Sequence, residues 1–473
     1  MTQQRSMWQG IANSIEQRSI DYIPLEIRHG KGWHQAPFWF TGGTVLPSLL
    51  IGYIGPSMGL GIGWTLLAVM AGMAFGTLFM ALHANQGPHL GLPQMIQSRA
   101  QFGAKGAIFP MMVAVFIYLG YNVFQFILSG EVVSVVAPGG KVWYLLFAVL
   151  ALVIAIIGHD FLHVFQRWSS YFIVALFAIV TVTILVHYPF SGADPAASGF
   201  SLKVFLVQFA AAGGYQISYA IYVSDYSRYL PTNIPARKLI GWTYLGGVTG
   251  ATWMACIGAL LGSYVKAADS IEALHEVGNL LFPGFGIVVI FGTLPAMIGT
   301  SGVNAYGAML TGVTIIDGIR HVKPSVVWRV AGLLVAGVIA AILSIALPEN
   351  YLDSFNTFLV IMTYLLVPWT AVNLTDYYLV RRGHYVISDI VSPEGVYGQW
   401  AWRGLSAYFL GFLAMIPFFS LSFYEGPATK ALGGADFSFV VGLAVSTVAY
   451  VLLTRGDAVV TTPARVPEAD VAV

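Results

Sequence analysis

The chain consists largely of long apolar segments separated by short polar stretches. A helix that crosses the hydrocarbon core of a bilayer needs roughly 20 apolar residues, and these segments meet that length. We therefore predict an all-α polytopic membrane protein with twelve transmembrane helices. The predicted spans are residues 37–58, 63–84, 108–136, 142–162, 168–189, 203–224, 240–265, 279–306, 325–347, 354–380, 403–424 and 435–454.

Two glycine pairs interrupt this pattern, Gly42-Gly43 in the first span and Gly213-Gly214 in the sixth. A backbone group without a partner costs several kcal/mol in hydrocarbon, so a helix is interrupted only where protein or ligand completes it. Small residues also let helices pack closely, which is the alternative explanation for either pair alone. Taking the pairs together, we predict that helices 1 and 6 are broken and that their breaks meet at a substrate site.

Composition agrees with a membrane protein and narrows its chemistry. Hydrophobic residues make up 57% of the 473 residues, charged residues make up 9%, and the mean hydropathy is +0.75, whereas a water-soluble chain needs more surface charge. The single cysteine, Cys256, excludes a disulfide and a thiolate metal site. The spans hold no nucleophile paired with a base, and the chain lacks a G-x-x-x-x-G-K-S/T phosphate loop. We expect a transporter without a cofactor, neither an enzyme nor an ATP-driven pump.

Arginines and lysines give an orientation, because cytoplasmic loops are enriched in both. With the N-terminus inside, all but four of the 22 arginines and lysines fall on the cytoplasmic side. The exceptions are Lys141, Lys203, Lys266 and Lys430. We predict a multi-pass protein of the cell membrane with cytoplasmic tails at residues 1–35 and 456–473. Its expected partners are the lipid bilayer and a small solute, with no nucleic acid, and its functional unit is expected to be a monomer.

The third span carries an aromatic and an amide side chain on one helical face, Tyr118 and Asn122. An aromatic plane one turn from an amide suits a flat heterocycle, which can stack on the ring and bond the amide. Packing of Tyr118 and a helix-to-helix bond from Asn122 is the alternative. Glu131, deeper toward the outer end of this span, is either a protonatable group or part of a wet vestibule.

Further walls of such a pocket come from the sixth and eighth spans. Gly214 is followed by Tyr215 and Gln216, and the eighth span holds Asn304 close to Thr300 and Ser301. The two hydroxyls could ligate a cation, although such residues more often bond the carbonyl one turn earlier in their own helix. Two amides, two tyrosines and a glutamine form a neutral pocket, which suits an uncharged ring better than an anion.

Three stretches together resemble the nucleobase:cation symporter-1 family, on its purine–cytosine permease side. They are Gly91-Leu92 with Ser98 to Gly106, Asn304-Ala305-Tyr306, and Val367-Pro368 with Asp376 to Arg382. The resemblance runs from about Ile23 to Tyr450 and implies a LeuT-type 5+5 inverted repeat with broken helices 1 and 6. It places the first repeat at 36–200, the second at 201–385 and two added helices at 386–455.

The resemblance also implies site residues. The family's third-span aromatic and amide match Tyr118 and Asn122, although relatives usually carry Trp at the first position. The sixth-span aromatic matches Tyr215, or Gln216 with a shift of one residue, the eighth-span amide matches Asn304, and the first helix contributes near Thr44 or Val45. Family members that use sodium hold the ion with carbonyls of helix 1 and hydroxyls of helix 8. Here these positions are Thr41, Thr44, Thr300 and Ser301.

The expected function is import of a nucleobase or related planar heterocycle, such as cytosine, a purine, hydantoin or an allantoin-like ring. Coupling to Na⁺ or H⁺ would drive it by alternating access, with spans 1, 2, 6 and 7 rocking against 3, 4, 8 and 9. The alternative is cation-coupled transport of another small solute, such as an amino acid or a thiamine-precursor pyrimidine.

Overall fold

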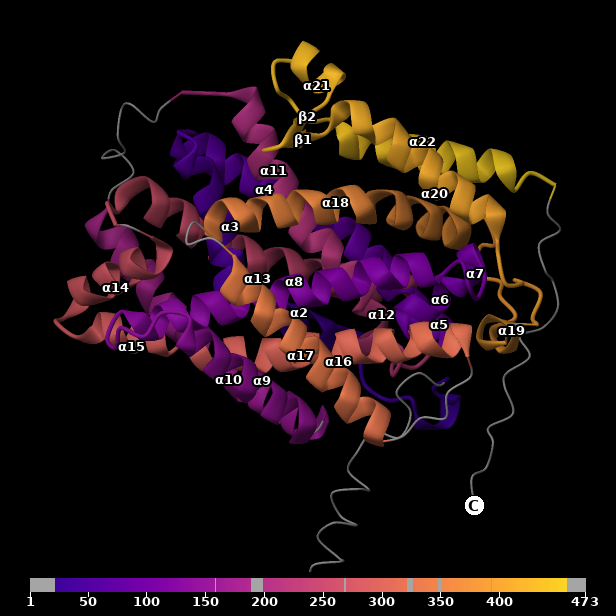
Figure 1. The fold of residues 1–473 in the computed structure, drawn as a ribbon, viewed down its shortest axis with the longest axis horizontal. Coiled ribbons are helices and arrows are strands. Elements are labelled where there is room, and N and C mark those ends of the chain that lie inside the picture. Colours follow the sequence, from indigo (N-terminus) through magenta and orange to yellow (C-terminus); the bar gives the residue numbers. More distant parts are fainter. Residues whose placement is uncertain are drawn as a thin grey trace, which may run out of the picture.

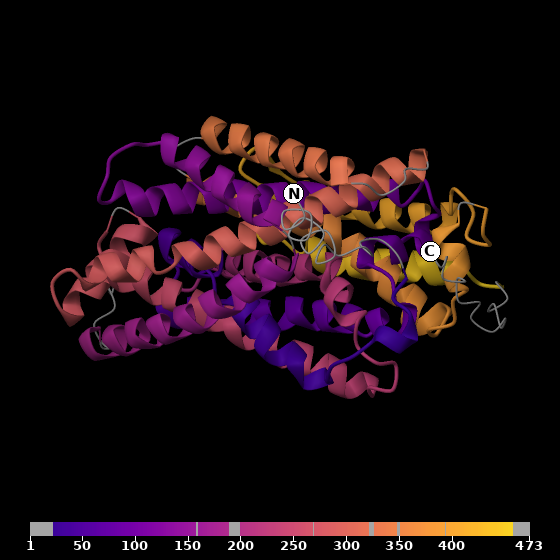
Figure 2. The same ribbon diagram turned by 90° about the horizontal axis from the view of Figure 1, so that it is seen from below.

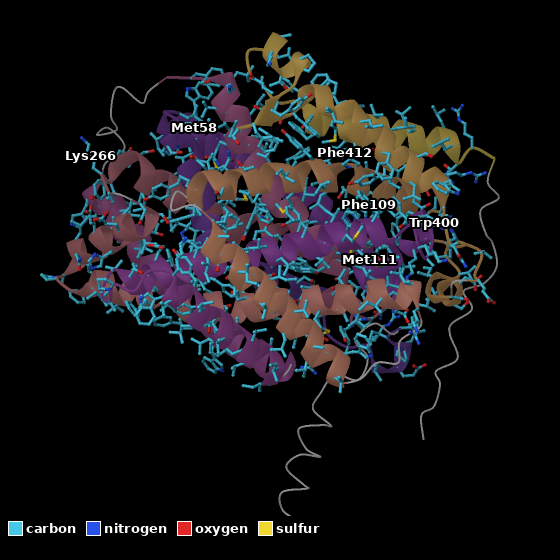
Figure 3. All side chains as sticks on the ribbon, in the orientation of Figure 1. Met58, Phe109, Met111, Lys266, Trp400 and Phe412 are labelled. Atoms are coloured by element: carbon cyan, nitrogen blue, oxygen red, sulfur yellow. The ribbon has the colours of Figure 1, made fainter. Side chains whose placement is uncertain are left out.

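The computed structural model describes residues 22–157, 159–188, 199–267, 269–320, 326–347, 351–392 and 394–456. Most of the predicted tails, at residues 1–21 and 457–473, lies outside these ranges. Figures 1 and 2 show an elongated helical body in which the long helices lie roughly along one axis. Figure 3 places Lys266 and Trp400 toward opposite ends of that axis, as expected if one belongs to an outer loop and the other to a cytoplasmic loop.

Helices make up nearly all regular structure of the described residues, with one short hairpin near the C-terminus. The longer helices are α2 (Gln35–Gly43), α3 (Leu46–Ser57), α4 (Ile62–Ala84), α8 (Ile108–Ser134), α9 (Val142–Ile157), α10 (His159–His187), α11 (Leu202–Ser218), α13 (Ala236–Tyr264), α14 (Ser270–Leu281), α15 (Phe285–Phe291), α16 (Leu294–Ile319), α17 (Val326–Ala346), α18 (Tyr351–Thr375), α20 (Trp402–Met415) and α22 (Ser438–Leu453). The short elements are α5 (Gln86–Leu90), α6 (Gln94–Gln97), α7 (Arg99–Phe102), α12 (Val223–Ser227), α19 (Ile387–Val391), α21 (Pro427–Ala431), β1 (Ser420–Leu421) and β2 (Tyr424–Glu425).

Eight described helical segments are long and apolar enough to cross a membrane, and the bent pair α2–α3 makes nine when counted as one span. Each predicted span overlaps a helix, but the eighth, predicted at 279–306, is wrong in position. The chain turns at Gly284, whose φ is +89°, and the Asn279 side chain accepts hydrogen bonds from the amides of Gly284 and Gly286. This turn separates α14 from α15, and α15 and α16 together form the apolar segment Phe285–Ile319.

The first span is interrupted directly after Gly42-Gly43. Thr44 and Val45 leave helical geometry, with φ/ψ of −90°/70° and −139°/158°, and α2 and α3 are bent by 60°. The Val45 carbonyl accepts hydrogen bonds from the backbone amides of Ser48 and Leu49. The interruption therefore lies where the glycine pair predicts it.

The sixth span contradicts the position of the second predicted break, since Gly213 and Gly214 lie inside the continuous helix α11. A Cβ on Gly214 would lie 1.8 Å from Thr363 Oγ1 of α18, so this glycine serves close packing. The helix instead tightens into a 3-10 turn at Tyr219–Ile221 and breaks at Tyr222, whose φ/ψ is −141°/3°, before α12.

The long helices form two groups with extensive internal contacts. Helices α2, α3, α4, α11 and α13 pack together, and we call them the bundle; α8, α9, α16 and α17 form the scaffold. Glycines let the bundle backbones meet: a Cβ on Gly258 of α13 would lie 1.8 Å from the Leu49 carbonyl of α3. The groups correspond to the predicted sets of spans 1, 2, 6, 7 and 3, 4, 8, 9.

Asp376, just after α18, is fully buried and joins separate parts of the chain. It accepts hydrogen bonds from Gln101 Nε2 at 2.7 Å, Tyr385 at 2.7 Å and Tyr450 at 2.8 Å, and from Arg381 Nε at 3.0 Å. Burial alone lowers the pKa of Arg381, but the charge of Asp376 outweighs this effect and raises it overall. These donors come from α7, α22 and the segment after α18, which the carboxylate ties together.

A comparison of two glycines in α13 tests the backbone packing of the bundle. Gly258→Ala should lower the thermal stability of the purified protein, because overpacking a tight contact costs about 1–3 kcal/mol. Gly241→Ala is the matched control, since a Cβ there meets no atom within 4 Å among the described residues. It should leave the melting temperature unchanged or raise it, because alanine favours the helix. Equal effects of the two substitutions in a detergent melting assay would contradict this packing.

Candidate substrate cavity

A cavity of about 300 Å³ lies between bundle and scaffold, beside the interruption of the sixth span. The scaffold side is formed by α8 and α16, and the bundle side by α2 and the segment around α12. The lining residues are His34, Gln35, Phe38, Tyr118, Tyr222, Asp225, Tyr226, Arg228, Tyr229, Val303, Tyr306, Gly307 and Leu310. Five tyrosines give this cavity the flat walls expected of a heterocycle site.

Tyr118 and Tyr222 face each other across the cavity, one from each body. Their ring centroids are 5.8 Å apart and the planes are inclined by 33°. Two stacking contacts of about 3.5 Å each would need roughly 7 Å. A planar ligand would therefore stack on one ring or move α12 and α8 slightly apart. Gly307 makes room for the Tyr118 ring, since a Cβ there would lie 2.7 Å from it.

Tyr222, which the sequence prediction did not include, occupies the position expected for Tyr215. A signal was present, because Tyr219, Tyr222 and Tyr226 recur at helical spacing just beyond the predicted site residues. Tyr215 is buried elsewhere, in a chain of hydroxyls: Ser48 donates to Tyr215 at 2.8 Å, and Tyr215 and Tyr219 share a hydrogen bond of 2.7 Å. The Tyr219 hydroxyl donates to the Gly42 carbonyl at 3.2 Å. This chain joins α11 to the interruption of the first span.

The register between α8 and α16 locates the candidate amides. Ser129 of α8 lies 3.8 Å from the sulfur of Met297 in α16, and Tyr118 of α8 lies against Gly307 of α16. The two helices are therefore antiparallel neighbours with a nearly constant offset. Between these contacts, that offset brings Asn122 opposite Asn304 and Gln125 opposite Ser301.

Buried amide oxygens on α8 lack donors within the part of the chain that the structure describes. They are Asn122 Oδ1 and Gln125 Oε1, on side chains that are 1% and 2% exposed. Leaving such an oxygen unpaired costs about 1–3 kcal/mol, which a ligand N–H can recover. Gln125 was missed in the sequence, although an amide one turn from Asn122 within a span is itself a signal. Asn304, 5% exposed, lies on the facing helix.

Gln216 and Gly214 have structural contacts away from this cavity. The Gln216 Nε2 donates to the Gly247 carbonyl of α13 at 2.7 Å, which holds α11 and α13 together. Gly214 packs on Thr363 of α18. The structure therefore gives both residues a role in helix packing, Gln216 within the bundle and Gly214 between α11 and α18.

The four hydroxyl residues expected near a cation lie in different bodies. Thr41 and Thr44 belong to the bundle and bond carbonyls of α2, with Thr44 donating to Phe40 at 2.8 Å. Thr300 of α16 donates to the Ala296 carbonyl at 2.8 Å, and the neighbouring Ser301 is buried. A cation held by all four would therefore bridge bundle and scaffold.

A second cavity of about 810 Å³ lies farther along α8 and α3, on the other side of Tyr121 and Tyr215. Its lining includes Tyr53, Glu131, Tyr144, Asp269 and Tyr351. Glu131 accepts a hydrogen bond from the Tyr144 hydroxyl. Glu131 therefore belongs to this vestibule and not to the cavity around Tyr118.

A chain of buried amides starts at the wall of the first cavity. Asp225 accepts from the backbone N–H of Gln94 at 2.7 Å, and the side-chain Nε2 of Gln94 donates to Gln86 Oε1 at 3.1 Å. Gln86 donates to Asn373 of α18 at 2.7 Å. Asn373 in turn donates to Gln101 at 3.3 Å, and Gln101 bonds Asp376. We call Gln94, Gln86, Asn373 and Gln101 the amide relay; their pairing across the sequence gave no local signal.

Comparison with solved structures identifies the fold. Mhp1 in an inward-facing conformation superimposes with a TM-score of 0.74 at 17% identity, covering 93% of this chain and 94% of Mhp1. Mhp1 in a closed conformation with bromovinylhydantoin bound is described as a nucleobase-cation-symport-1 family transporter. It superimposes with a TM-score of 0.72 at 16% identity, covering 93% of this chain and 95% of Mhp1. The chain therefore has the LeuT-type fold of Mhp1.

Sequence comparison identifies the family. Residues 22–442 match the family described as permeases for cytosine/purines, uracil, thiamine and allantoin. YxlA of Bacillus subtilis strain 168, whose name assigns it provisionally to the purine-cytosine permeases, is 36% identical over 442 residues, covering 93% of this chain and 96% of YxlA. The purine-cytosine permease fcyB of Emericella nidulans is 24% identical over 473 residues, covering 93% and 88%.

These matches confirm the prediction of a multi-pass membrane transporter that is not an enzyme. The match covers most of the chain and includes the three stretches that carry the resemblance. The chain belongs to the permease family for cytosine, purines, uracil, thiamine and allantoin, on the purine–cytosine permease side of the nucleobase:cation symporter-1 family.

Proposed function

We propose that this protein imports a nucleobase or related planar heterocycle, coupled to a cation by alternating access. The carrying observation is the cavity between bundle and scaffold, where Tyr118 and Tyr222 offer flat faces. The buried oxygens of Asn122 and Gln125 lie one and two turns farther along α8, outside the lining of this cavity. Cytosine, purines, hydantoins and allantoin-like rings combine a flat face with N–H donors. Such rings would satisfy the unpaired oxygens while stacking on a tyrosine.

Relatives support this substrate class. The name of fcyB assigns it purines and cytosine, and Mhp1 has been solved with bromovinylhydantoin bound. A thiamine-precursor pyrimidine is a ring of similar shape, and thiamine appears in the family description. An amino acid is the less favoured alternative. Asp225 and Arg228 do line the cavity, but Asp225 already accepts from the backbone N–H of Gln94, and the two unpaired oxygens on α8 are uncharged amide groups.

The transport cycle we propose consists of rocking the bundle against the scaffold, which alternately opens the cavity around Tyr118 and the vestibule around Glu131. Twelve spans in a 5+5 inverted repeat, with helices 1 and 6 interrupted and both termini cytoplasmic, fit this cycle. The hydrogen bond from Tyr219 to the Gly42 carbonyl supports it, since it joins the two interruptions within one moving body. The functional unit is a monomer in the cell membrane.

The coupling ion is proposed to lie between the helix 1 interruption and α16. The backbone leaves helical geometry at Thr44, whose carbonyl would supply one oxygen ligand, and Thr300 and Ser301 would supply hydroxyls, as an ion of sodium size requires. Binding across bundle and scaffold would favour one conformation, and such a difference in affinity is what coupling needs. A proton is the alternative coupling ion.

Uptake of radiolabelled heterocycles by cells that express the chain tests the function directly. Unlabelled cytosine, purines, hydantoin, allantoin, thiamine-precursor pyrimidines and amino acids serve as competitors, in Na⁺ and choline buffers at two pH values. At least one planar heterocycle should be taken up and compete. Competition by amino acids alone would overturn the proposed substrate class.

Substitution of the amides tests the binding site. Asn122→Ala and Asn304→Ala should each reduce uptake at low substrate concentration by about tenfold, because each removes roughly one hydrogen bond of 1–1.5 kcal/mol to the ligand. Met112→Ala, on a side chain of α8 that is 52% exposed, is the control and should transport normally. Normal uptake by both amide variants at equal surface expression would move the site elsewhere.

Tyr222 and Tyr215 can be separated by substitution. Tyr222→Ala should raise the half-inhibitory concentration of a planar competitor about tenfold, since stacking on an aromatic side chain contributes about 1–3 kcal/mol, and Tyr222→Phe should restore it. Tyr215→Phe keeps a ring but removes the bonds to Ser48 and Tyr219, so it should lower thermal stability more than ligand affinity. The reverse ranking of the two residues in the competition assay would assign the stacking role to Tyr215.

The ion proposal has a control within the same helix. Thr300→Ala and Ser301→Ala should raise the Na⁺ concentration for half-maximal uptake at least about fivefold, because each removes one oxygen ligand. Thr314→Ala removes a hydroxyl that bonds its own helix in the same way, donating to Leu310 at 2.8 Å, and should have no such effect. If uptake by the wild type depends on pH but not on the Na⁺ concentration, these hydroxyls do not hold the coupling ion.

A further inference from the structure

A groove of about 710 Å³ lies on the outer surface of the bundle, where the start of α2 meets the start of α13. It is lined by Gly30, Lys31, Gly32, Trp33, Ala36, Pro37, Ile234, Pro235, Lys238 and Trp242. The two helices touch closely just beyond it, since a Cβ on Gly246 would lie 2.2 Å from the Ala36 carbonyl. Closely packed backbone of α2 and α13 therefore borders the groove.

The groove combines exposed cations with exposed indoles. Lys31 and Lys238 line it, Arg237 is exposed beside it, and the described residues of its lining include no carboxylate. Trp33 is 50% and Trp242 is 40% exposed. Tryptophan is enriched at membrane–water interfaces, and basic side chains there attract anionic lipids. The lysines match a phosphate group in charge, and the indoles match the upper part of an acyl chain.

The same short helix also lines the candidate substrate cavity. His34, Gln35 and Phe38 face that cavity, whereas Trp33, Ala36 and Pro37 face the groove. A single helix, α2, is thus the wall between the two. Whatever occupies the groove contacts a segment that borders the substrate.

We propose that this groove binds the headgroup and upper acyl chain of an anionic phospholipid, which braces α2 against α13. The family assignment makes the chain a membrane permease, and the groove lies where the candidate span Ala236–Tyr264 begins, as expected for a membrane–water interface. Charge selects the lipid class, because a zwitterionic headgroup offers the lysines no net negative charge. The proposal requires neither a particular substrate nor a particular coupling ion.

Lipid titration of the purified full chain in detergent tests the site. Phosphatidylglycerol is the probe, phosphatidylcholine with the same acyl chains is the neutral comparison, and inorganic phosphate is the free anion. Bound lipid is counted by native mass spectrometry, and the melting temperature is followed in parallel. Phosphatidylglycerol should bind in preference to phosphatidylcholine and raise the melting temperature, whereas inorganic phosphate should do neither.

Charge removal should then weaken this binding. The Lys31→Gln/Lys238→Gln double variant should lose about 25-fold in phosphatidylglycerol affinity, since each basic side chain near an anionic lipid surface contributes roughly a fivefold factor. Both side chains are exposed, so folding should be unaffected. Arg455→Gln, an exposed basic residue after α22, is the matched control and should bind as the wild type does.

Removal of the indoles provides a second variant. Trp33→Ala/Trp242→Ala should weaken the binding of both lipids, because it removes apolar contact without changing charge. Three results would overturn the proposal: wild-type lipid retention by the lysine double variant, equal binding of the two lipids, or equal stabilisation by inorganic phosphate. All three readouts are independent of transport, so they stand whether or not the proposed substrate class is correct.

Discussion

Backbone groups inside a bilayer must find partners within the protein, and this requirement governs where the chain can leave helical geometry. At the first interruption, the Val45 carbonyl accepts from Ser48 and Leu49, and the Gly42 carbonyl accepts from the Tyr219 hydroxyl. Tyr219 itself belongs to the second interruption. The second interruption therefore helps to complete the first, and the candidate cavity lies beside the second.

Close backbone contacts fix helices of the bundle to one another and to α18. Gly258 lets α13 approach α3, and Gly214 lets α11 approach Thr363 of α18. Contacts this tight leave little freedom to slide, since interiors at native density resist continuous deformation. The proposed motion between bundle and scaffold would then take place at the cavity, where the tyrosines meet.

Patterns that depend on local sequence predicted much of this arrangement. Each span predicted from apolar length overlaps a helix, although the eighth is misplaced, and the first interruption directly follows Gly42-Gly43. Tyr118 and Asn122 lie one turn apart in α8, but only Tyr118 lines the candidate cavity. Interactions between distant segments could not be predicted in this way. Gly214 is explained by its contact with Thr363 of α18, which is distant in the sequence. The interruption of the sixth span falls at Tyr222, where the sequence has no glycine. The amide relay likewise joins side chains almost 300 positions apart, which hydropathy does not record.

The amide relay has a mechanical consequence for α12. Amides pair only when donor meets acceptor, so a shift of α12 would break hydrogen bonds in the row from Asp225 to Asp376. The row therefore favours the position of α12 seen here. Because Tyr450 of α22 also donates to Asp376, the position of α12 is linked through this row to that of α22.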